Sequence, residues 1–229
     1  MTLKQLCGGT APAALLFDLD GTLLDSLPDL ATAIDRMLIE LGYAAVGAQR
    51  VHGWIGDGAR QLVHEALSFA LGETDVDRLN DAMLERALGI YMRHYADCCT
   101  DRSRLFAGVR EALAVWGERG VAMACVTNKS ARFTEPLLEH FALQEWLPIA
   151  VSGDTLAQRK PAAAPLLFAC ERLGVDPQHA VMIGDSRNDV LAARAAGMPA
   201  VCVSYGYNHG RSIAAETPDG IVDSLLELL

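Results

Sequence analysis

The chain has 229 residues, of which 51% are hydrophobic, and it carries a formal net charge of −10 at pH 7. This apolar content supplies a sizeable core and excludes a mainly disordered chain, while the length fits one domain or a domain with a smaller insert. The acidic balance argues against a nucleic acid as partner, because binding a polyanion requires clustered lysine and arginine side chains.

The first predicted element is an apolar run that ends in two carboxylates: residues 15–24 read LLFDLDGTLL. Such a run, bounded by a turn, fits a fully buried parallel strand, and open α/β sheets bind ligands at the carboxyl ends of their strands. Asp18 and Asp20 lie two residues apart and therefore share a face, so their mutual repulsion requires a cation or a shared proton. The stretch predicts a divalent metal site.

Three helices are predicted after this strand, because apolar residues recur there at helical spacing, and Gly42 ends the first of them. Strand patterns are absent between Leu27 and Cys98. The three helices are expected at residues 28–41, 59–71 and 76–95.

The position of this helical block predicts an inserted domain. We expect an all-helical cap domain of residues 27–98 and a core domain made of residues 1–26 and 99–229, because the block interrupts an α/β pattern after its first strand. The two connections between the domains, near residues 25–28 and 99–106, are expected to act as hinges.

Strands and helices alternate after the helical block, beginning with a predicted helix at residues 109–119. This alternation is typical of a parallel sheet covered by helices, and we therefore expect a doubly wound, Rossmann-like α/β fold. Pro136 interrupts one predicted helix, whose regular part is expected to begin only near Glu135, with Pro136 in its first turn. The strands are expected at residues 121–126, 149–152, 180–183 and 199–203, and the later helices at 130–141, 164–173, 189–196 and 223–229.

Four short motifs stand beside predicted strand ends. They are D-x-D-G-T at residues 18–22, V-T-N at 126–128, K-P at 160–161 and G-D-S-R-N-D at 184–189. In this order the motifs resemble the haloacid-dehalogenase superfamily, and their span covers most of the chain. The resemblance implies an Mg²⁺-dependent phosphomonoester hydrolase that works through an aspartyl-phosphate intermediate.

The resemblance assigns the chemistry to three side chains. Asp18 would be the nucleophile, because a carboxylate that forms an aspartyl-phosphate divides one very slow hydrolysis into two easier steps. Asp20 would protonate the leaving alkoxide and then deprotonate the attacking water. Lys160 would bring positive charge to Asp18 and the phosphoryl group, which lowers the cost of bringing two anions together.

The resemblance also implies residues that bind the phosphoryl group. Gly21 would let the backbone approach the phosphate closely, and Thr127 and Asn128 would donate hydrogen bonds to its oxygens at the same edge of the sheet. A threonine and an asparagine after a strand also suit a helix cap, so a purely structural role stays open for Asn128. Thr22 is expected to brace the turn.

Mg²⁺ is the cofactor that the motifs imply, because this ion favours octahedral oxygen ligation and usually keeps several waters. We expect Asp18, the backbone carbonyl of Asp20 and Asp185 as direct protein ligands. Asp189 would ligate the ion through water or orient Lys160. The competing interpretation of Asp185 is a helix cap without a metal.

Two further segments resemble elements of bacterial phosphoglycolate phosphatases. Residues 54–59 resemble a cap loop that closes over the active site, in which Gly56 would allow a close approach to the substrate, and residues 205–210 would shape the rim of the site. Asp57 stands where most relatives carry asparagine. An added anion facing a substrate carboxylate would be unfavourable, so either Asp57 lies outside the pocket or the substrate differs.

The resemblance therefore implies hydrolysis of 2-phosphoglycolate to glycolate and phosphate as the most specific function. Three cations are candidates for binding the carboxylate of such a substrate: Arg60, Lys129 and Arg132. The alternative for each of them is a solvated surface side chain.

Other activities of the superfamily fit the sequence less well. A dehalogenase would not need an acid at Asp20, and a phosphonate hydrolase that uses a cap lysine lacks its residue, because residues 27–106 contain no lysine. A sugar-phosphate phosphatase or phosphomutase shares the core chemistry and is the enzymatic alternative. The alternative from another class is a phosphate-binding sensor or phospho-acceptor, which would need neither the acid nor the helical cap.

The expected partner is a small phosphate ester, with neither a nucleic acid nor a membrane involved. No apolar run approaches about 18 residues, and residues 1–10 lack the charged start and apolar core of a secretion signal. The six cysteines show no C-x-x-C spacing, and we expect them to be reduced thiols in the cytoplasm. The sequence is compatible with a monomer or a homodimer.

Overall fold

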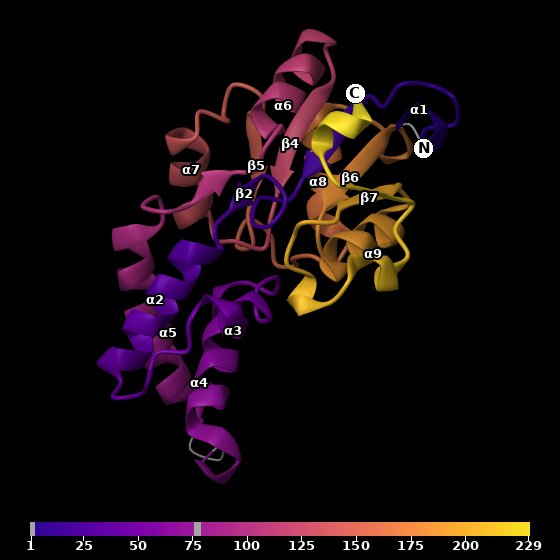
Figure 1. The fold of residues 1–229 in the computed structure, drawn as a ribbon. Helices are drawn as coiled ribbons and strands as arrows, with labels where there is room; N and C mark the ends of the chain where they lie inside the picture. Colours follow the sequence, from indigo (N-terminus) through magenta and orange to yellow (C-terminus); the bar gives the residue numbers. More distant parts are fainter. Residues whose placement is uncertain (1–2, 76–78) are drawn as a thin grey trace.

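The structure, a computed structural model, describes residues 3–75 and 79–229, and its larger lobe is built on a six-stranded sheet (Figure 1). The strands of this sheet are β1 (Ala14–Phe17), β4 (Ala122–Val126), β5 (Ile149–Val151), β6 (Ala180–Gly184), β7 (Ala200–Val203) and β8 (Gly220–Val222). They lie in the order β5-β4-β1-β6-β7-β8, and every neighbouring pair is parallel. The chain fills one side of β1 and then the other, which confirms the doubly wound fold predicted from the sequence.

The register of the three central strands places the motif segments side by side. Phe17, the last residue of β1, lies opposite Cys125 of β4 and Ile183 of β6. The residues that follow these strands therefore leave the sheet at one edge, where ligands bind in open α/β folds. All four residues of β1 are buried, as expected of a strand covered on both faces.

Helices cover both faces of the sheet. The helices of the larger lobe are α6 (Val109–Glu118), α7 (Ala131–His140), α8 (Ala164–Leu173) and α9 (Arg187–Ala196). Leu15 and Phe17 of β1 share a hydrophobic cluster with residues of α6 and α7, whereas Leu16 shares another with residues of α8 and α9. Alternate residues of one strand thus serve opposite faces, which fixes how the helices sit around the sheet.

A helical block forms the second, smaller lobe (Figure 1). It consists of α2 (Leu27–Glu40), α3 (Ala48–His52), α4 (Ala59–Asp75) and α5 (Asp81–Cys98). These helices bury an apolar cluster that includes Ile34, Val63 and Tyr91, and Phe133 and Tyr207 of the larger lobe also belong to it. We keep residues 27–98 as the proposed extent of the cap.

Two short antiparallel strands, β2 (Leu24–Asp25) and β3 (Arg104–Leu105), join the lobes. The buried carboxylate of Asp29 accepts hydrogen bonds from the backbone N–H groups of Arg102 (3.0 and 3.1 Å) and Ser103 (2.7 Å) and from the Ser103 hydroxyl (2.6 Å). One carboxylate therefore ties the two connections together. Movement of the cap about these connections stays a prediction.

Pro136 contradicts the sequence-based expectation for α7. The helix begins at Ala131, so Pro136 lies in its interior and not in its first turn. Pro136 has no N–H to donate to the carbonyl of Arg132, one turn earlier. Both residues are exposed, so water can hydrogen-bond to that carbonyl and the cost of the proline falls.

The helices of the smaller lobe also differ from their predicted bounds. α5 begins at Asp81, because the side chain of Asn80 accepts a hydrogen bond from the Met83 N–H (2.9 Å) and acts as an N-cap. Residues 76–78, predicted as the start of this helix, lie outside the described residues. In α4, Gly72 has a non-helical φ of 67°, which agrees with the predicted end of the regular helix near Leu71.

Short elements were not predicted, because two to five residues are too few to show a period. They include α1 (Leu3–Leu6), α3, β2, β3 and the edge strand β8. The predicted C-terminal helix of residues 223–229 is a single 3₁₀ turn, Leu225–Leu228.

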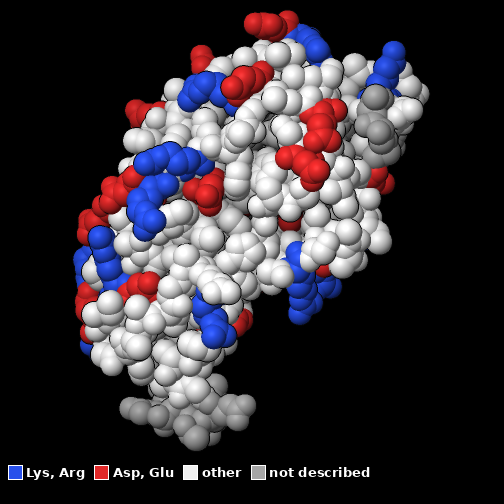
Figure 2. Space-filling model, viewed as in Figure 1, with Lys and Arg blue, Asp and Glu red and all other residues white. Residues whose placement is uncertain are grey.

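Three expectations from composition can be compared with the structure. On the face shown in Figure 2, lysine and arginine side chains are interspersed with aspartate and glutamate, without a continuous basic area among the described residues. Across residues 3–75 and 79–229, no helix has the length and apolarity needed to cross a membrane. All six cysteines are free and buried, as expected of thiols.

Candidate active site

The predicted site residues gather at the carboxyl edge of the sheet and face the helical block across a small pocket. The pocket has a cavity volume of about 60 Å³. On the sheet side it is lined by Asp18, Asp20, Thr127, Asn128, Lys129, Ser130, Phe133, Asp185 and Ser186, and on the helical side by Leu30, Ile55, Gly56, Gly58, Ala59, Leu62, Tyr91 and Tyr95. Register explains this gathering, because Asp18, Thr127 and Asp185 follow three adjacent strands.

Lys160 lies at the centre of a buried charge network behind the pocket. Its ammonium is 2.9 Å from Asp18 Oδ1 and 2.7 Å from Asp189 Oδ1, and it donates to the backbone carbonyl of Val126 at 2.6 Å. Burial by itself would lower the pKa of Lys160, but the carboxylates of Asp18 and Asp189 raise it above its usual value. Lys160 therefore stays charged.

The negative charges of the Asp18 and Asp185 carboxylates are less fully compensated by their surroundings. Burial raises the pKa of Asp18 to about 6 although Lys160 lowers it, and burial together with the nearby Asp18 raises the pKa of Asp185 well above its usual range. Asp185 accepts hydrogen bonds from the Thr22 hydroxyl (3.0 Å) and the Tyr207 N–H (2.7 Å). These bonds fix the carboxylate of Asp185 close to Asp18 despite their repulsion.

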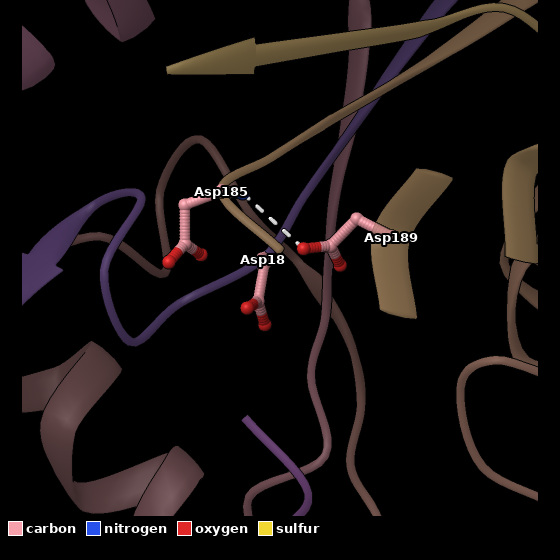
Figure 3. A group of neighbouring side chains, drawn as sticks. All are labelled: Asp18, Asp185 and Asp189. Atoms are coloured by element: carbon pink, nitrogen blue, oxygen red, sulfur yellow. Dashed lines mark hydrogen bonds between the residues drawn. The ribbon is translucent and has the colours of Figure 1, made fainter. Parts of the chain in front are cut away.

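Asp189 has a different role in the network. Its Oδ2 accepts hydrogen bonds from the Ser186 hydroxyl (2.7 Å) and from the backbone N–H groups of Ser186 (3.0 Å) and Asp185 (3.2 Å; Figure 3). Ser186 is the N-cap of α9, so the alternative in which Asp185 caps this helix is not what the structure shows. Both oxygens of Asp189 have partners, since Oδ1 accepts from Lys160.

The three carboxylates fit a bound cation. Figure 3 shows Asp18, Asp185 and Asp189 projecting toward one space, and one oxygen of each lies within 4.8 Å of the others. Two oxygens on opposite sides of Mg²⁺ are about 4.2 Å apart, given Mg–O distances of about 2.1 Å. A cation at Asp18 and Asp185 would offset the burial and the neighbouring negative charges that raise their pKa values. Asp189, whose oxygens are already engaged, suits an indirect role that orients Lys160.

Asp20 lines the same pocket as Asp18, and its carboxylate is paired with Lys129. The ammonium of Lys129 donates to both of its carboxylate oxygens, at 2.9 and 2.8 Å, and lies 4.8 Å from the centre of the Tyr95 ring. Tyr95, a side chain from α5, thus packs against the lysine that pairs with the predicted acid. Of the three cations predicted as carboxylate ligands, Lys129 lines the pocket.

The structure does not bring Arg60 or Arg132 to the pocket. Arg60 is exposed and pairs with Asp81 (3.4 Å) and Glu85 on α5. Its neighbour Ala59 faces the pocket, and the turn of about 100° per residue on a helix directs Arg60 elsewhere. The sequence-based assignment of Arg60 to the substrate is therefore not retained.

Arg132 is exposed on the first turn of α7, with its guanidinium 5.4 Å from the centre of the Phe133 ring. Phe133, the next residue, lines the pocket instead. A helix can present only one of two consecutive side chains to the same side. Arg132 thus matches the solvated alternative that the sequence left open.

The loop before α4 closes the pocket through its backbone. The carbonyl of Gly56 accepts hydrogen bonds from the side-chain amides of Asn128 and Asn188, both at 3.1 Å. Gly56 has a φ of 138°, and a Cβ there would lie 2.9 Å from His209 Nε2, so a larger residue would strain this loop. Asn128 also donates to the carbonyl of Lys160 at 2.9 Å.

Asp57 lies outside the pocket. Its Oδ1 accepts a hydrogen bond from the Asn188 amide at 2.7 Å, and its Oδ2 is 3.6 Å from His209 Nε2. The extra anion therefore faces the rim of the core, which removes the conflict with an anionic substrate that the sequence raised.

Two further predicted residues are Gly21, which lies beside Asp185, and Thr127, which lines the pocket. Gly21 has a φ of 88°, and a Cβ there would lie 2.4 Å from Asp185 Oδ2, so glycine lets the turn pass beside this carboxylate. Thr127 is buried, lines the pocket, and its hydroxyl accepts from the Lys129 N–H at 3.3 Å. Thr127 can therefore donate its hydroxyl proton to a ligand.

Tyr207 is a residue whose importance the sequence did not reveal. Its N–H binds Asp185, while its hydroxyl donates to Asp25 (2.9 Å) and accepts from the backbone N–H groups of Ser26 (2.9 Å) and Leu27 (3.0 Å). One residue thus links the carboxylate cluster to the connection that leads into the helical lobe. Residues 205–210 were predicted to shape the rim, but no local pattern distinguishes Tyr207 from its neighbours.

Comparison with known proteins identifies a protein family that the chain matches. The family model described as haloacid dehalogenase-like hydrolase matches residues 15–203, a span that includes all four motifs. A phosphoglycolate phosphatase of Pseudomonas putida is 46% identical over 226 residues, which are 99% of this chain and 82% of the relative. A phosphoglycolate phosphatase of Nitrosococcus oceani is 44% identical over 218 residues, which are 95% of each chain.

Solved structures agree with this comparison. The crystal structure of a predicted phosphoglycolate phosphatase from Haemophilus somnus superimposes with a TM-score of 0.89 at 32% identity, over 94% of this chain and 96% of the other. The similarity extends over both lobes, because such coverage leaves out few residues of either chain.

Proposed function

Because the chain belongs to the haloacid dehalogenase-like hydrolase family, we propose that it hydrolyses 2-phosphoglycolate to glycolate and phosphate, through an aspartyl-phosphate on Asp18. The observation that carries this proposal is the position of Asp18, which opens onto the pocket between Lys160 and Asp185. Relatives named phosphoglycolate phosphatase, at 44 to 46% identity, support the choice of substrate.

In the first half of the reaction, Asp18 attacks the phosphorus and the bond from phosphorus to the ester oxygen breaks. Lys160 and Thr127 offset the charge of the phosphoryl oxygens, so that a carboxylate can approach a dianion. Asp20 gives its proton to the leaving alkoxide, which departs as glycolate.

In the second half, water attacks the phosphorus of the aspartyl-phosphate, and the bond between phosphorus and Asp18 breaks. Asp20, now a carboxylate, takes a proton from this water. Inorganic phosphate leaves and Asp18 is restored. The closed loop at Gly56 keeps bulk water from competing during the first half.

Asp18, Asp185 and the carbonyl of Asp20 would hold Mg²⁺, with Asp189 in an indirect role. The bound ion supplies positive charge that lets Asp18 and the phosphoryl group come together. The fit of three buried carboxylates within 4.8 Å supports this cofactor.

The pocket favours a small ester over a sugar phosphate. A cavity of about 60 Å³ holds only a few water-sized groups, since one water needs about 10–15 Å³ by this measure. The helical side offers mostly apolar side chains such as Leu30, Ile55 and Leu62, which form no hydrogen bonds with sugar hydroxyls. A phosphomutase would also need polar groups that bind the phosphate of its product.

The test is a turnover screen across small phosphomonoesters, including 2-phosphoglycolate, sugar phosphates and nucleoside monophosphates. The release of inorganic phosphate is measured for each ester. We expect the highest kcat/KM for 2-phosphoglycolate. A higher value for a sugar phosphate would contradict the substrate, and conversion of a sugar phosphate to its isomer would indicate a phosphomutase. Stable binding without phosphate release would indicate a sensor.

A further inference from the structure

Lys129 is the basic residue that lines the pocket, among the residues that the structure describes. Its side chain is 6% exposed, and its ammonium contacts both carboxylate oxygens of Asp20 and the face of Tyr95. A lysine is rarely buried so completely unless its charge is paired. The position of this charge between Asp20 and the helical lobe requires an explanation beyond packing.

Lys160 cannot supply positive charge to the part of the substrate that lies beyond the ester oxygen. Its ammonium is already engaged by three groups, because it pairs with the carboxylate of Asp18 and donates hydrogen bonds to Asp189 and to the carbonyl of Val126. By contrast, Lys129 has its protons on one carboxylate and an aromatic face. A second carboxylate can take one of these protons without leaving Asp20 unpaired.

The chemistry of the substrate places its carboxylate next to Lys129. In 2-phosphoglycolate one methylene separates the ester oxygen from the carboxylate. Asp20 must approach that ester oxygen to protonate it, so the substrate carboxylate arrives beside a side chain that Lys129 already contacts. Without a cation, this arrangement would leave two carboxylates together once Asp20 has given up its proton, beside an aromatic wall formed by Tyr91, Tyr95 and Phe133.

We propose that Lys129 is the specificity-determining residue that binds the substrate carboxylate while it positions Asp20 at the ester oxygen. This inference rests on the proposed function and deepens it, because it assigns recognition of the carboxylate to the core side of the pocket. Ser130, the next residue, lines the same wall, and its buried hydroxyl has no hydrogen-bond partner among the described residues. Ser130 can therefore donate a second hydrogen bond to the same carboxylate.

The experiment compares two esters of equal length, 2-phosphoglycolate and ethyl phosphate, which differ in the carboxylate. The kcat and KM of the full chain with Mg²⁺ are measured for wild type, Lys129→Met, Lys129→Arg and Lys4→Met. Lys4 is exposed on α1 and serves as the matched lysine control.

We expect Lys129→Met to reduce the ratio of kcat/KM between the two esters by about 10- to 100-fold, the range for losing a hydrogen bond to a charged group. The loss should include a higher KM for 2-phosphoglycolate. The kcat/KM for ethyl phosphate should fall only to the extent that turnover depends on the positioning of Asp20. Lys129→Arg should restore part of the ratio, and Lys4→Met should leave it unchanged.

Two results would overturn the inference, and they can be told apart. If wild type prefers 2-phosphoglycolate but Lys129→Met slows both esters equally, Lys129 only positions Asp20 and the proposed function stands. If wild type shows no preference between the esters, the proposed function and the inference both fail. Should thermal unfolding show that Lys129→Met does not fold, Lys129→Arg decides, and an unchanged ratio there would contradict the inference.

Discussion

The two sides of the pocket differ in how they are built. On the core side, each charged group is held by several partners: Lys160 by two carboxylates and a carbonyl, and Asp185 by a hydroxyl and an N–H. On the helical side, the pocket is lined mainly by apolar side chains, and the loop before α4 contacts the core through the carbonyl of Gly56 and the carboxylate of Asp57. Chemistry that needs fixed charges is therefore expected from the core.

This difference also bears on movement. The core network is buried and lies within one lobe, so it can persist through the predicted movement of the helical lobe. The contacts across the pocket are fewer and are made by backbone atoms, the Asp57 carboxylate and the stacking of Tyr95 against Lys129. Substitutions on the core side should consequently have larger effects than substitutions on the loop that closes it.

Asp18→Asn should have the largest effect. An amide cannot form the acyl-phosphate, so turnover should fall on the order of 10⁴-fold or more. Acid-quenched wild type should carry one substrate-derived phosphoryl group on Asp18, and the variant none. Labelling retained in the variant would contradict the assignment of the nucleophile.

Asp20→Asn should have the second-largest effect, with a rate about 10² to 10⁴ times lower than that of wild type. Phosphoryl transfer should slow most for an alkyl phosphate, because an aryl leaving group needs less protonation, and phosphate release should slow with both. Single-turnover kinetics that follow transfer and release separately would measure this. Equal slowing of transfer for both esters, with release unchanged, would restrict Asp20 to a structural role.

Asp185→Ala should raise the Mg²⁺ concentration needed for half-maximal activity by about 10- to 100-fold or more, because it removes a direct ligand. Excess chelator should stop wild-type turnover, and added Mg²⁺ should restore it. Titration of activity with Mg²⁺ gives the concentration for half-maximal activity of the variant and of wild type. Full activity in excess chelator would exclude the proposed metal.

Tyr207→Phe tests the link between the core cluster and the helical lobe. The variant keeps the N–H that binds Asp185 but loses the hydroxyl that contacts Asp25, Ser26 and Leu27. We expect kcat/KM to fall about 3- to 10-fold, on the scale of the net contribution of a single hydrogen bond, because the three lost bonds act on the connection and not on the substrate, while the Mg²⁺ requirement stays the same. Tyr43→Phe on the helical lobe is the control. An increased Mg²⁺ requirement would show that the hydroxyl also supports the metal site.

Asp57→Asn should have the smallest effect. Asparagine keeps an oxygen that can accept from Asn188, and the pair with His209 is half-exposed and therefore weak. We expect kcat/KM for 2-phosphoglycolate to change by less than about twofold. An increase above about tenfold would mean that the Asp57 carboxylate faces the substrate during turnover.

Several features of the molecule follow from local sequence. The apolar run before Asp18 identified β1, and the alternation of strands and helices after residue 109 predicted the parallel sheet. The positions of Asp18, Thr127 and Asp185 at one edge followed as well, because parallel strands bring their carboxyl ends together. These predictions succeeded because they depend on periodicity and on the few ways in which such elements can pack.

The direction of individual side chains was decided only by the tertiary structure. Arg60 and Lys129 were equal candidates in the sequence, yet helix rotation turns Arg60 toward Glu85 while Lys129 meets Asp20 across 109 residues of chain. The orientation of Asp57 and the two contacts of Tyr207 likewise depend on partners from distant segments. A local pattern sets the type and period of an element, but its rotation and partners are fixed by packing against the rest of the chain.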